Sequence, residues 1–444
     1  MNYRLLYILL LPLLLIGCSG DDDTTTTHIR RTIMVYFNAE NNLYSAATTD
    51  LNELVTGSNK LASDCNLLVY FDVMSNPVIY TIAKGKKEVL KTFDPDIDSS
   101  DPDNMLSVFQ TMIALSPSDE YATVFWGHGD GPIIANGTNS LDLDIADNEA
   151  NSYGADYNSN NENKSSNATW IDIPQLASVM KQLPKQEFIF FDACCMQSVE
   201  VAYELRNCTK YLIGATCETP SFGAPYSTTT RLFGISDAET AAKAILDDYQ
   251  NNSTWKIWQE DYKINNVCMS VIKTENIEEL LTATSNALQT ISGTTPLELT
   301  TTFNSDEHDA TSCIYYFKTN GYRYGYPILY DMNDVMLHNL TAENYSVWRN
   351  AFDKVVIYHP NTGDIRDTGN CDWFGGDSYS TFGKNLPTMS IKNFRSFYLS
   401  DETYGGVSFF MPRSEYASQT YPNMNTRMYD YEWCQKVGWK DLGW

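Results

Sequence analysis

The chain has 444 residues and a formal net charge of −26 at pH 7. This charge argues against nucleic acid as a partner, because phosphate binding needs basic patches; it either favours basic peptides or only keeps the protein soluble. The length exceeds that of one ordinary hydrophobic core, so we expect more than one domain.

The first seventeen residues have the form of an export signal. Arg4 is followed by an apolar run from Leu5 to Ile16 and then by Gly17 and Cys18. The run is too short for a membrane-spanning helix, and acidic residues follow at once. We predict a lipoprotein signal over residues 1–17 with lipidation of Cys18; the alternative is an ordinary secretory signal.

Residues 18–27 are a polar, acidic tether that cannot bury a face. An acidic stretch after the lipidated cysteine is similar to the surface-export signals of Bacteroidetes lipoproteins. The segment therefore predicts an outer membrane lipoprotein that could be displayed on the cell surface.

Strand and helix patterns then alternate along the chain. Strands are expected at residues 32–37, 66–72, 78–83, 121–126, 187–192 and 211–216. Helices are expected at residues 42–55, opened by asparagine caps, and at residues 102–114, 173–182, 198–206 and 238–251. This order predicts an α/β fold with a mostly parallel central sheet flanked by helices on both faces.

The rhythm loosens after residue 254. We expect a strand at residues 267–273, a helix at 275–292, a short strand at 313–317 and a helix at 342–356. The predicted division is a catalytic domain at residues 28–254 and a C-terminal subdomain at residues 255–444.

Two buried strands each end at a reactive side chain. The run 121–126 leads to Gly127, His128 and Gly129, and the run 187–192 leads to Ala193 and Cys194. Side chains at the carboxyl ends of neighbouring parallel strands converge in one crevice. A histidine and a cysteine there can form a dyad in which the thiolate attacks a carbonyl. The backbone amides of Gly129 and Cys194 could then face the oxyanion. Either residue alone would more often be structural.

Three blocks carry a family resemblance. They are residues 126–129, residues 191–196 with 200–203, and the late run 405–412. Together they resemble the clostripain family of cysteine peptidases, which is related in fold to caspases, gingipains and legumains. The resemblance implies a caspase-like sheet, His128 as general base and Cys194 as nucleophile.

Position 195 departs from the family pattern, because a second cysteine stands where the family usually has a larger apolar or aromatic residue. The family pattern counts the nucleophile two residues after the aspartate, which selects Cys194. Adjacent residues leaving a strand point in opposite directions. We therefore expect Cys195 to be buried at the start of the next helix.

Cysteine spacing gives no metal site. Ten cysteines include Cys18, so nine remain in the mature chain, an odd number that leaves at least one free thiol. No Cys/His cluster has zinc-site spacing, so we assign no residue as a metal ligand. Calcium is the one cofactor that the resemblance allows, since some relatives use it.

Specificity rests on acidic residues. Clostripain-like enzymes prefer Arg or Lys before the cut bond, and the resemblance makes Asp192 the first candidate carboxylate of that pocket. Asp192 could instead cap the following helix. Glu218 is the acidic residue after the next strand, and it is the second candidate.

A polar insertion at residues 142–167 separates the His and Cys strands. Its composition predicts an exposed segment that does not pack. The resemblance implies activation by cleavage, because proteases of the clostripain type are commonly activated by cutting a linker between the strands that carry the two catalytic residues. Lys164 is the only basic residue of this insertion. We expect self-cleavage after Lys164, or else a loop that is never cut.

The resulting prediction is a cysteine endopeptidase acting on peptides or proteins with basic residues. The first alternative is an inactive, lipid-anchored protein of the same fold that binds peptides or a surface partner. A second is another thiol enzyme, such as a transpeptidase or amidase, since the dyad serves any acyl transfer.

Overall fold

The structure is a computed structural model. It describes residues 28–132, 152–157, 168–217, 219, 221–252, 254–257, 260–263, 268–291, 315–318, 327–359, 402–412 and 424–439. Within these residues no helix is long and apolar enough to cross a membrane.

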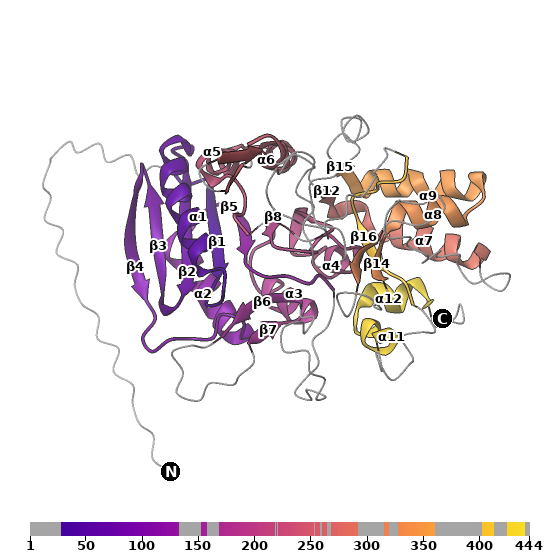
Figure 1. The fold of residues 1–444 in the computed structure, drawn as a ribbon, viewed down its shortest axis with the longest axis horizontal. Coiled ribbons are helices and arrows are strands. Elements are labelled where there is room, and N and C mark those ends of the chain that lie inside the picture. Colours follow the sequence, from indigo (N-terminus) through magenta and orange to yellow (C-terminus); the bar gives the residue numbers. More distant parts are fainter. Residues whose placement is uncertain are drawn as a thin grey trace, which may run out of the picture.

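A nine-stranded sheet forms the centre of the molecule, in the order β15-β12-β9-β8-β5-β1-β2-β3-β4 (Figure 1). The strands are β1 (Arg31–Asn38), β2 (Cys65–Val73), β3 (Ser75–Ala83), β4 (Lys86–Thr92), β5 (Glu120–Trp126), β8 (Gln186–Asp192), β9 (Thr209–Ala215), β12 (Met269–Lys273) and β15 (Val356–Tyr358). The five inner strands β2, β1, β5, β8 and β9 run parallel, and the outer strands join them antiparallel. β1 and β8 are buried along their whole length, as their continuous apolar runs require in a sheet covered on both faces.

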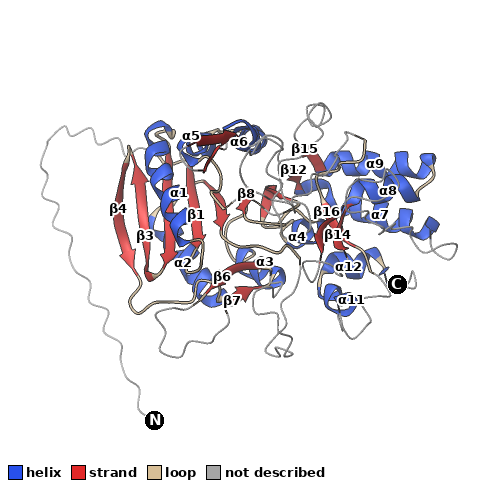
Figure 2. Ribbon diagram, viewed as in Figure 1, coloured by secondary structure: helices blue, strands red, loops and turns tan. Residues whose placement is uncertain are grey.

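Helices cover both faces of this sheet, as Figure 2 shows by element type. One core contains side chains of α1 (Tyr44–Gly57), α5 (Tyr226–Thr229) and α6 (Ala238–Asn252). The other contains side chains of α2 (Pro102–Leu115), α3 (Ile173–Met180), α4 (Val199–Glu204), α7 (Ile277–Ile291), α8 (Met332–Asn339), α9 (Ala342–Val355) and α12 (Glu432–Val437). The predicted α/β class with a mostly parallel sheet is confirmed.

Smaller elements surround this frame. They are the pair β6 (Tyr153–Asp156) and β7 (Thr169–Ile171), the pair β10 (Thr254–Ile257) and β11 (Glu260–Lys263), the sheet of β13 (Tyr315–Lys318), β14 (Pro327–Asp331) and β16 (Ser408–Phe410), and helix α11 (Met424–Arg427). The Phe410 backbone N–H donates to the buried Glu200 carboxylate at 2.7 Å, which fastens the late family block to α4. The predicted boundary at residues 254/255 does not coincide with an edge of the central sheet, because β12 and β15 follow it.

The expectation that residues 142–167 do not pack is wrong for residues 152–157. Tyr153 is fully buried, with its ring 5.3 Å from Phe125 and 6.0 Å from Phe191 between centroids. Its hydroxyl donates to the Trp126 carbonyl at 3.1 Å. One large aromatic side chain therefore anchors this part of a polar segment to the His and Cys strands.

Candidate active site

β5 and β8 bring the predicted nucleophile and base to matched positions. Trp126 pairs with Asp192 at the end of the two strands, and His128 and Cys194 each follow two residues later. A side chain at Gly129 would place its Cβ 2.7 Å from the Cys194 carbonyl oxygen. The two loops therefore touch through their backbones, and this contact requires glycine at position 129.

The two adjacent cysteines differ in exposure. Cys194 is half-buried, and the Thr219 N–H donates to its Sγ at 3.2 Å. Cys195 is fully buried, as predicted, and its N–H donates to the Cys217 carbonyl at 2.9 Å. The expectation that Cys195 starts a helix is wrong, because its φ of 58° is left-handed and α4 begins only at Val199.

His128 has a side-chain partner that the sequence did not reveal. Its Nε2 lies 2.7 Å from Asn42 Oδ1. The amide oxygen accepts a hydrogen bond from Nε2–H, so Nδ1 carries no proton in the neutral ring and remains available as a base. Burial lowers the pKa of His128 to about 4, which keeps the ring neutral at pH 7. The expectation that asparagine caps open α1 is wrong. The N-cap residue is Leu43, and no side chain makes a capping hydrogen bond at this helix start.

Asp192 lies in a buried polar cluster behind the nucleophile loop. Its Oδ2 accepts hydrogen bonds from Ala224 N and the Tyr226 hydroxyl, both at 2.8 Å, and its Oδ1 accepts one from the Tyr249 hydroxyl at 3.3 Å. Burial raises the pKa of this carboxyl to about 6, although these three donors oppose the shift. Asp192 does not cap α4; the Ser198 side chain does, by accepting from Val201 N.

Asp50 from α1 is a second buried acid beside Asp192, and sequence reasoning missed it. Its Oδ2 accepts from Trp126 Nε1 at 2.8 Å. A Cβ at Gly223 would lie 2.3 Å from Asp50 Oδ2 and 2.8 Å from Asp192 Oδ2, so Gly223 covers both carboxyls. Burial, and secondly the charge of Asp192, raise the pKa of Asp50 well above its ordinary range. The two acids therefore form one site that favours a cation.

Three predicted positions, Cys18, Lys164 and Glu218, lie outside the described residues. Among the described residues, three buried carboxylates that could hold a metal ion lie together, namely Glu40, Asp72 and Asp156. No sequence motif marks them, because they come from three separated segments.

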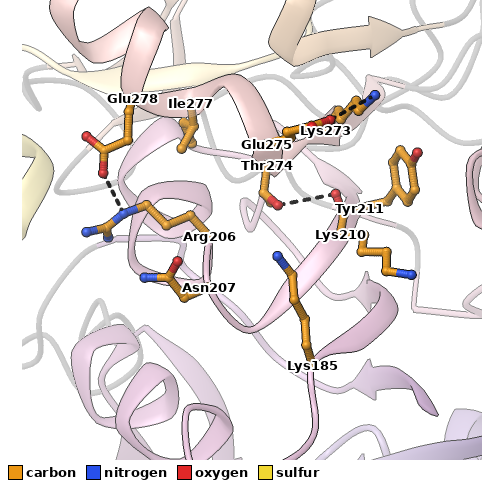
Figure 3. Close-up of a pocket in the computed structure, with 10 residues that line it drawn as sticks. All are labelled: Lys185, Arg206, Asn207, Lys210, Tyr211, Lys273, Thr274, Glu275, Ile277 and Glu278. Carbon is orange, nitrogen blue, oxygen red and sulfur yellow. Dashed lines mark hydrogen bonds and ion pairs between the residues drawn. The ribbon is translucent and has the colours of Figure 1, made fainter. Parts of the chain in front are cut away.

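A pocket of about 580 Å³ lies at the amino ends of β8 and β9, and Figure 3 shows the residues that line it. It is lined by Lys185 before β8 and Lys210 in β9, and Arg206 in its wall is paired with Glu278 at 2.9 Å. Because β8 and β9 start here, this pocket is separate from the site at their carboxyl ends.

The fold and the described site define an α/β peptidase of the cysteine type. The chain belongs to the clostripain family, whose family model matches residues 35–444.

A solved structure of a secreted C11 cysteine protease from Bacteroides thetaiotaomicron, in complex with an irreversible peptide inhibitor, is 28% identical to this chain. The match has a TM-score of 0.68 and covers 93% of this chain and 100% of the other. An inactive zymogen C11 protease from Parabacteroides distasonis, 22% identical with a TM-score of 0.65, shares the fold over 93% of this chain and 99% of its own. A search of curated proteins gives no match.

Proposed function

We propose that the protein is an endopeptidase in which His128 and Cys194 form the catalytic dyad. The observation that carries this proposal is their equivalent position beyond the paired residues Trp126 and Asp192. His128 Nδ1 takes the thiol proton, and Cys194 Sγ attacks the substrate carbonyl. The proton then passes to the leaving amine, and water hydrolyses the thioester to release the acid and restore the thiol.

The backbone N–H groups of Gly129 and Cys194 are proposed to stabilise the oxyanion. Gly129 lies against the Cys194 carbonyl, so the two amides belong to loops in direct contact. Fixed backbone donors need no reorganisation when charge develops, which is why such donors commonly contribute much of the rate enhancement.

The proposed specificity is for Arg or Lys before the scissile bond. Asp192 and Asp50 supply two carboxyls within one buried site. Glu218, the acidic residue that follows β9 in the sequence, is the third candidate. A bound guanidinium or ammonium group would pair with the ionised carboxylate and lower its pKa. The inhibitor in the B. thetaiotaomicron complex is a peptide, which supports a peptide substrate here.

Activation is proposed to occur by cleavage after Lys164 in the 142–167 insertion. Thr219 contacts Cys194 Sγ, and Gly223 covers Asp192 and Asp50. We propose that cleavage lets Thr219 and residues 221–224 shift, so that substrate gains full access to the thiol and the carboxyls. We also propose that export through residues 1–17 and lipidation of Cys18 hold the mature protein at the outer membrane.

The test uses fluorogenic peptides that end in Arg, Lys or an uncharged residue, with the protein before and after treatment with an activating protease. Cys194→Ala and His128→Ala should lose at least about a thousandfold in kcat/KM on basic peptides. Cys195→Ala is the matched control and should keep activity, because that thiol is buried. Silence of the wild-type protein on every peptide would instead favour a binding protein of the same fold.

A further inference from the structure

A half-buried tryptophan lies beside the proposed base. The ring of Trp170 in β7 is 6.1 Å from the ring of His128 between centroids, and the two ring planes are inclined by 48°. Among the described residues, Trp170 is the only aromatic side chain in ring contact with His128. Its neighbour Ile171 is fully buried in the core, and adjacent residues of a strand point to opposite faces. Trp170 therefore belongs to the active-site side of β7.

The strand pair that carries Trp170 is bonded to the His128 loop. Tyr153 in β6 forms an antiparallel bridge with Gly129 and is also paired with Ile171 in β7. The Gly154 N–H donates to the His128 carbonyl at 2.9 Å. β6 thus lies between the His128 loop and β7, and the backbone holds Trp170 in a fixed place relative to His128.

One hydrogen bond does not fix an imidazole ring. The contact of 2.7 Å between His128 Nε2 and Asn42 Oδ1 restrains one edge of the ring but leaves it able to tilt. A general base must come within hydrogen-bond reach of the proton it takes, so a small tilt costs rate. A flat indole packed against the imidazole removes this freedom.

The same contact keeps water from the ring. Burial is the cause that lowers the pKa of His128 to about 4, and no charged side chain contributes to that shift. The two side chains in contact with the imidazole, those of Asn42 and Trp170, do not titrate. Cys194, the proposed partner, is the titratable group on the neighbouring loop.

We propose that Trp170 is a positioning residue for the general base. Its indole holds the His128 ring in the orientation in which Nδ1 faces Cys194 Sγ, and it shields the ring from water. Asn42 and Trp170 then restrain His128 from two elements, the segment before α1 and strand β7. The effect on catalysis rests on the proposed function, whereas the shielding of His128 does not.

The first experiment compares kcat and KM on one Lys peptide at pH 8 in the full chain. Trp170→Ala should lower kcat at least about tenfold and change KM by less than about twofold, because it removes a group that acts through the base. Trp170→Phe keeps a flat ring and should retain kcat within about threefold. Tyr157→Ala is the control: Tyr157 is 45% exposed, directly follows β6 and makes no ring contact with another described residue. That variant should keep kcat.

The second experiment does not need activity. In the full chain carrying Cys194→Ala, NMR of labelled histidines is followed between pH 8 and pH 5, and His128→Gln identifies the His128 resonance among the five histidines. In the parent, His128 should stay neutral over this range, because its pKa is about 4. In Trp170→Ala, water reaches the ring, so the midpoint should rise toward the ordinary value of 6.5 and enter the range. Trp170→Phe should behave like the parent.

Two results would overturn the proposal. The first is a His128 titration that is the same in Trp170→Ala as in the parent. The second is a rise in KM at unchanged kcat, which would make Trp170 a contact of the substrate instead of the base. Silence of the wild-type chain on every peptide is a failure of the proposed function, and the NMR titration still decides whether Trp170 shields His128. If Trp170→Ala does not fold, Trp170→Leu takes its place in both experiments, since it keeps apolar volume but lacks the flat ring.

Discussion

Replacing Asp192 with asparagine should stabilise the fold at alkaline pH while removing activity on basic peptides. The ordinary pKa of this carboxyl is 3.8, and the fold raises it to about 6. One pKa unit corresponds to 1.36 kcal/mol, so ionised Asp192 destabilises the native state by about 3 kcal/mol relative to its protonated form. A neutral isostere does not carry this penalty.

Asparagine can satisfy the same three partners. Its Oδ1 can accept from Ala224 N and Tyr226, as Asp192 Oδ2 does, and its Nδ2 can donate to Tyr249, whose hydroxyl also accepts. The volume is unchanged, so no cavity forms. The expected gain in unfolding free energy at pH 8 is therefore close to the full electrostatic term, about 3 kcal/mol.

The pH window follows from the direction of the shift. The pKa of Asp192 is higher in the folded state than in the unfolded state. Protonated Asp192 therefore contributes its full stabilisation to the free energy of unfolding below pH 3.8, and this stabilisation is lost as the pH rises through about 6. Asp192→Asn should remove this dependence. The difference between variant and parent should thus be small at pH 4 and largest above pH 7.

The assay is urea unfolding at several pH values in the Cys194→Ala background, together with kcat/KM of Asp192→Asn alone on Lys and Arg peptides. Asp50→Asn is the matched comparison at the neighbouring acid. The reasoning is refuted if Asp192→Asn is less stable than its parent at pH 8, since the ionised carboxylate would then favour the fold. Unchanged turnover of basic peptides would refute the assigned specificity.

Three further outcomes are expected. On basic peptides kcat/KM should fall first near pH 6, as Asp192 of the proposed specificity site becomes protonated. A second acid limb, set by His128, should lie near pH 4, because burial lowers the pKa of His128 to that value, and pH titration of peptide hydrolysis measures both. Asn42→Asp should move this limb to higher pH by placing a charge beside His128 Nε2, and an unmoved limb would show that Asn42 does not orient the ring. Glu200→Ala should destabilise the protein by about 1–3 kcal/mol in urea, since it removes the buried carboxylate that accepts the Phe410 N–H hydrogen bond. Glu200→Gln keeps that acceptor and should lose much less; equal losses would show that the hydrogen bond is not the cause.

Local sequence determined the strands that position the dyad. Apolar runs of strand length, ended by Gly127 before His128 and by Ala193 before Cys194, predicted β5 and β8 to within a residue. The same runs indicated a buried parallel sheet, because both faces of each strand are apolar. The relative exposure of Cys194 and Cys195 also followed, since adjacent residues leave a strand in opposite directions.

Tertiary structure alone decided which polar groups meet. Asp50 lies beside Asp192, Asn42 beside His128, and Asp156 close to Asp72, although each pair is separated by more than eighty residues. No local pattern marks such pairs, because periodicity reports only which face of an element a residue occupies. The order of the strands in the sheet and the anchoring of Tyr153 fix these contacts, and the proposed specificity site depends on them.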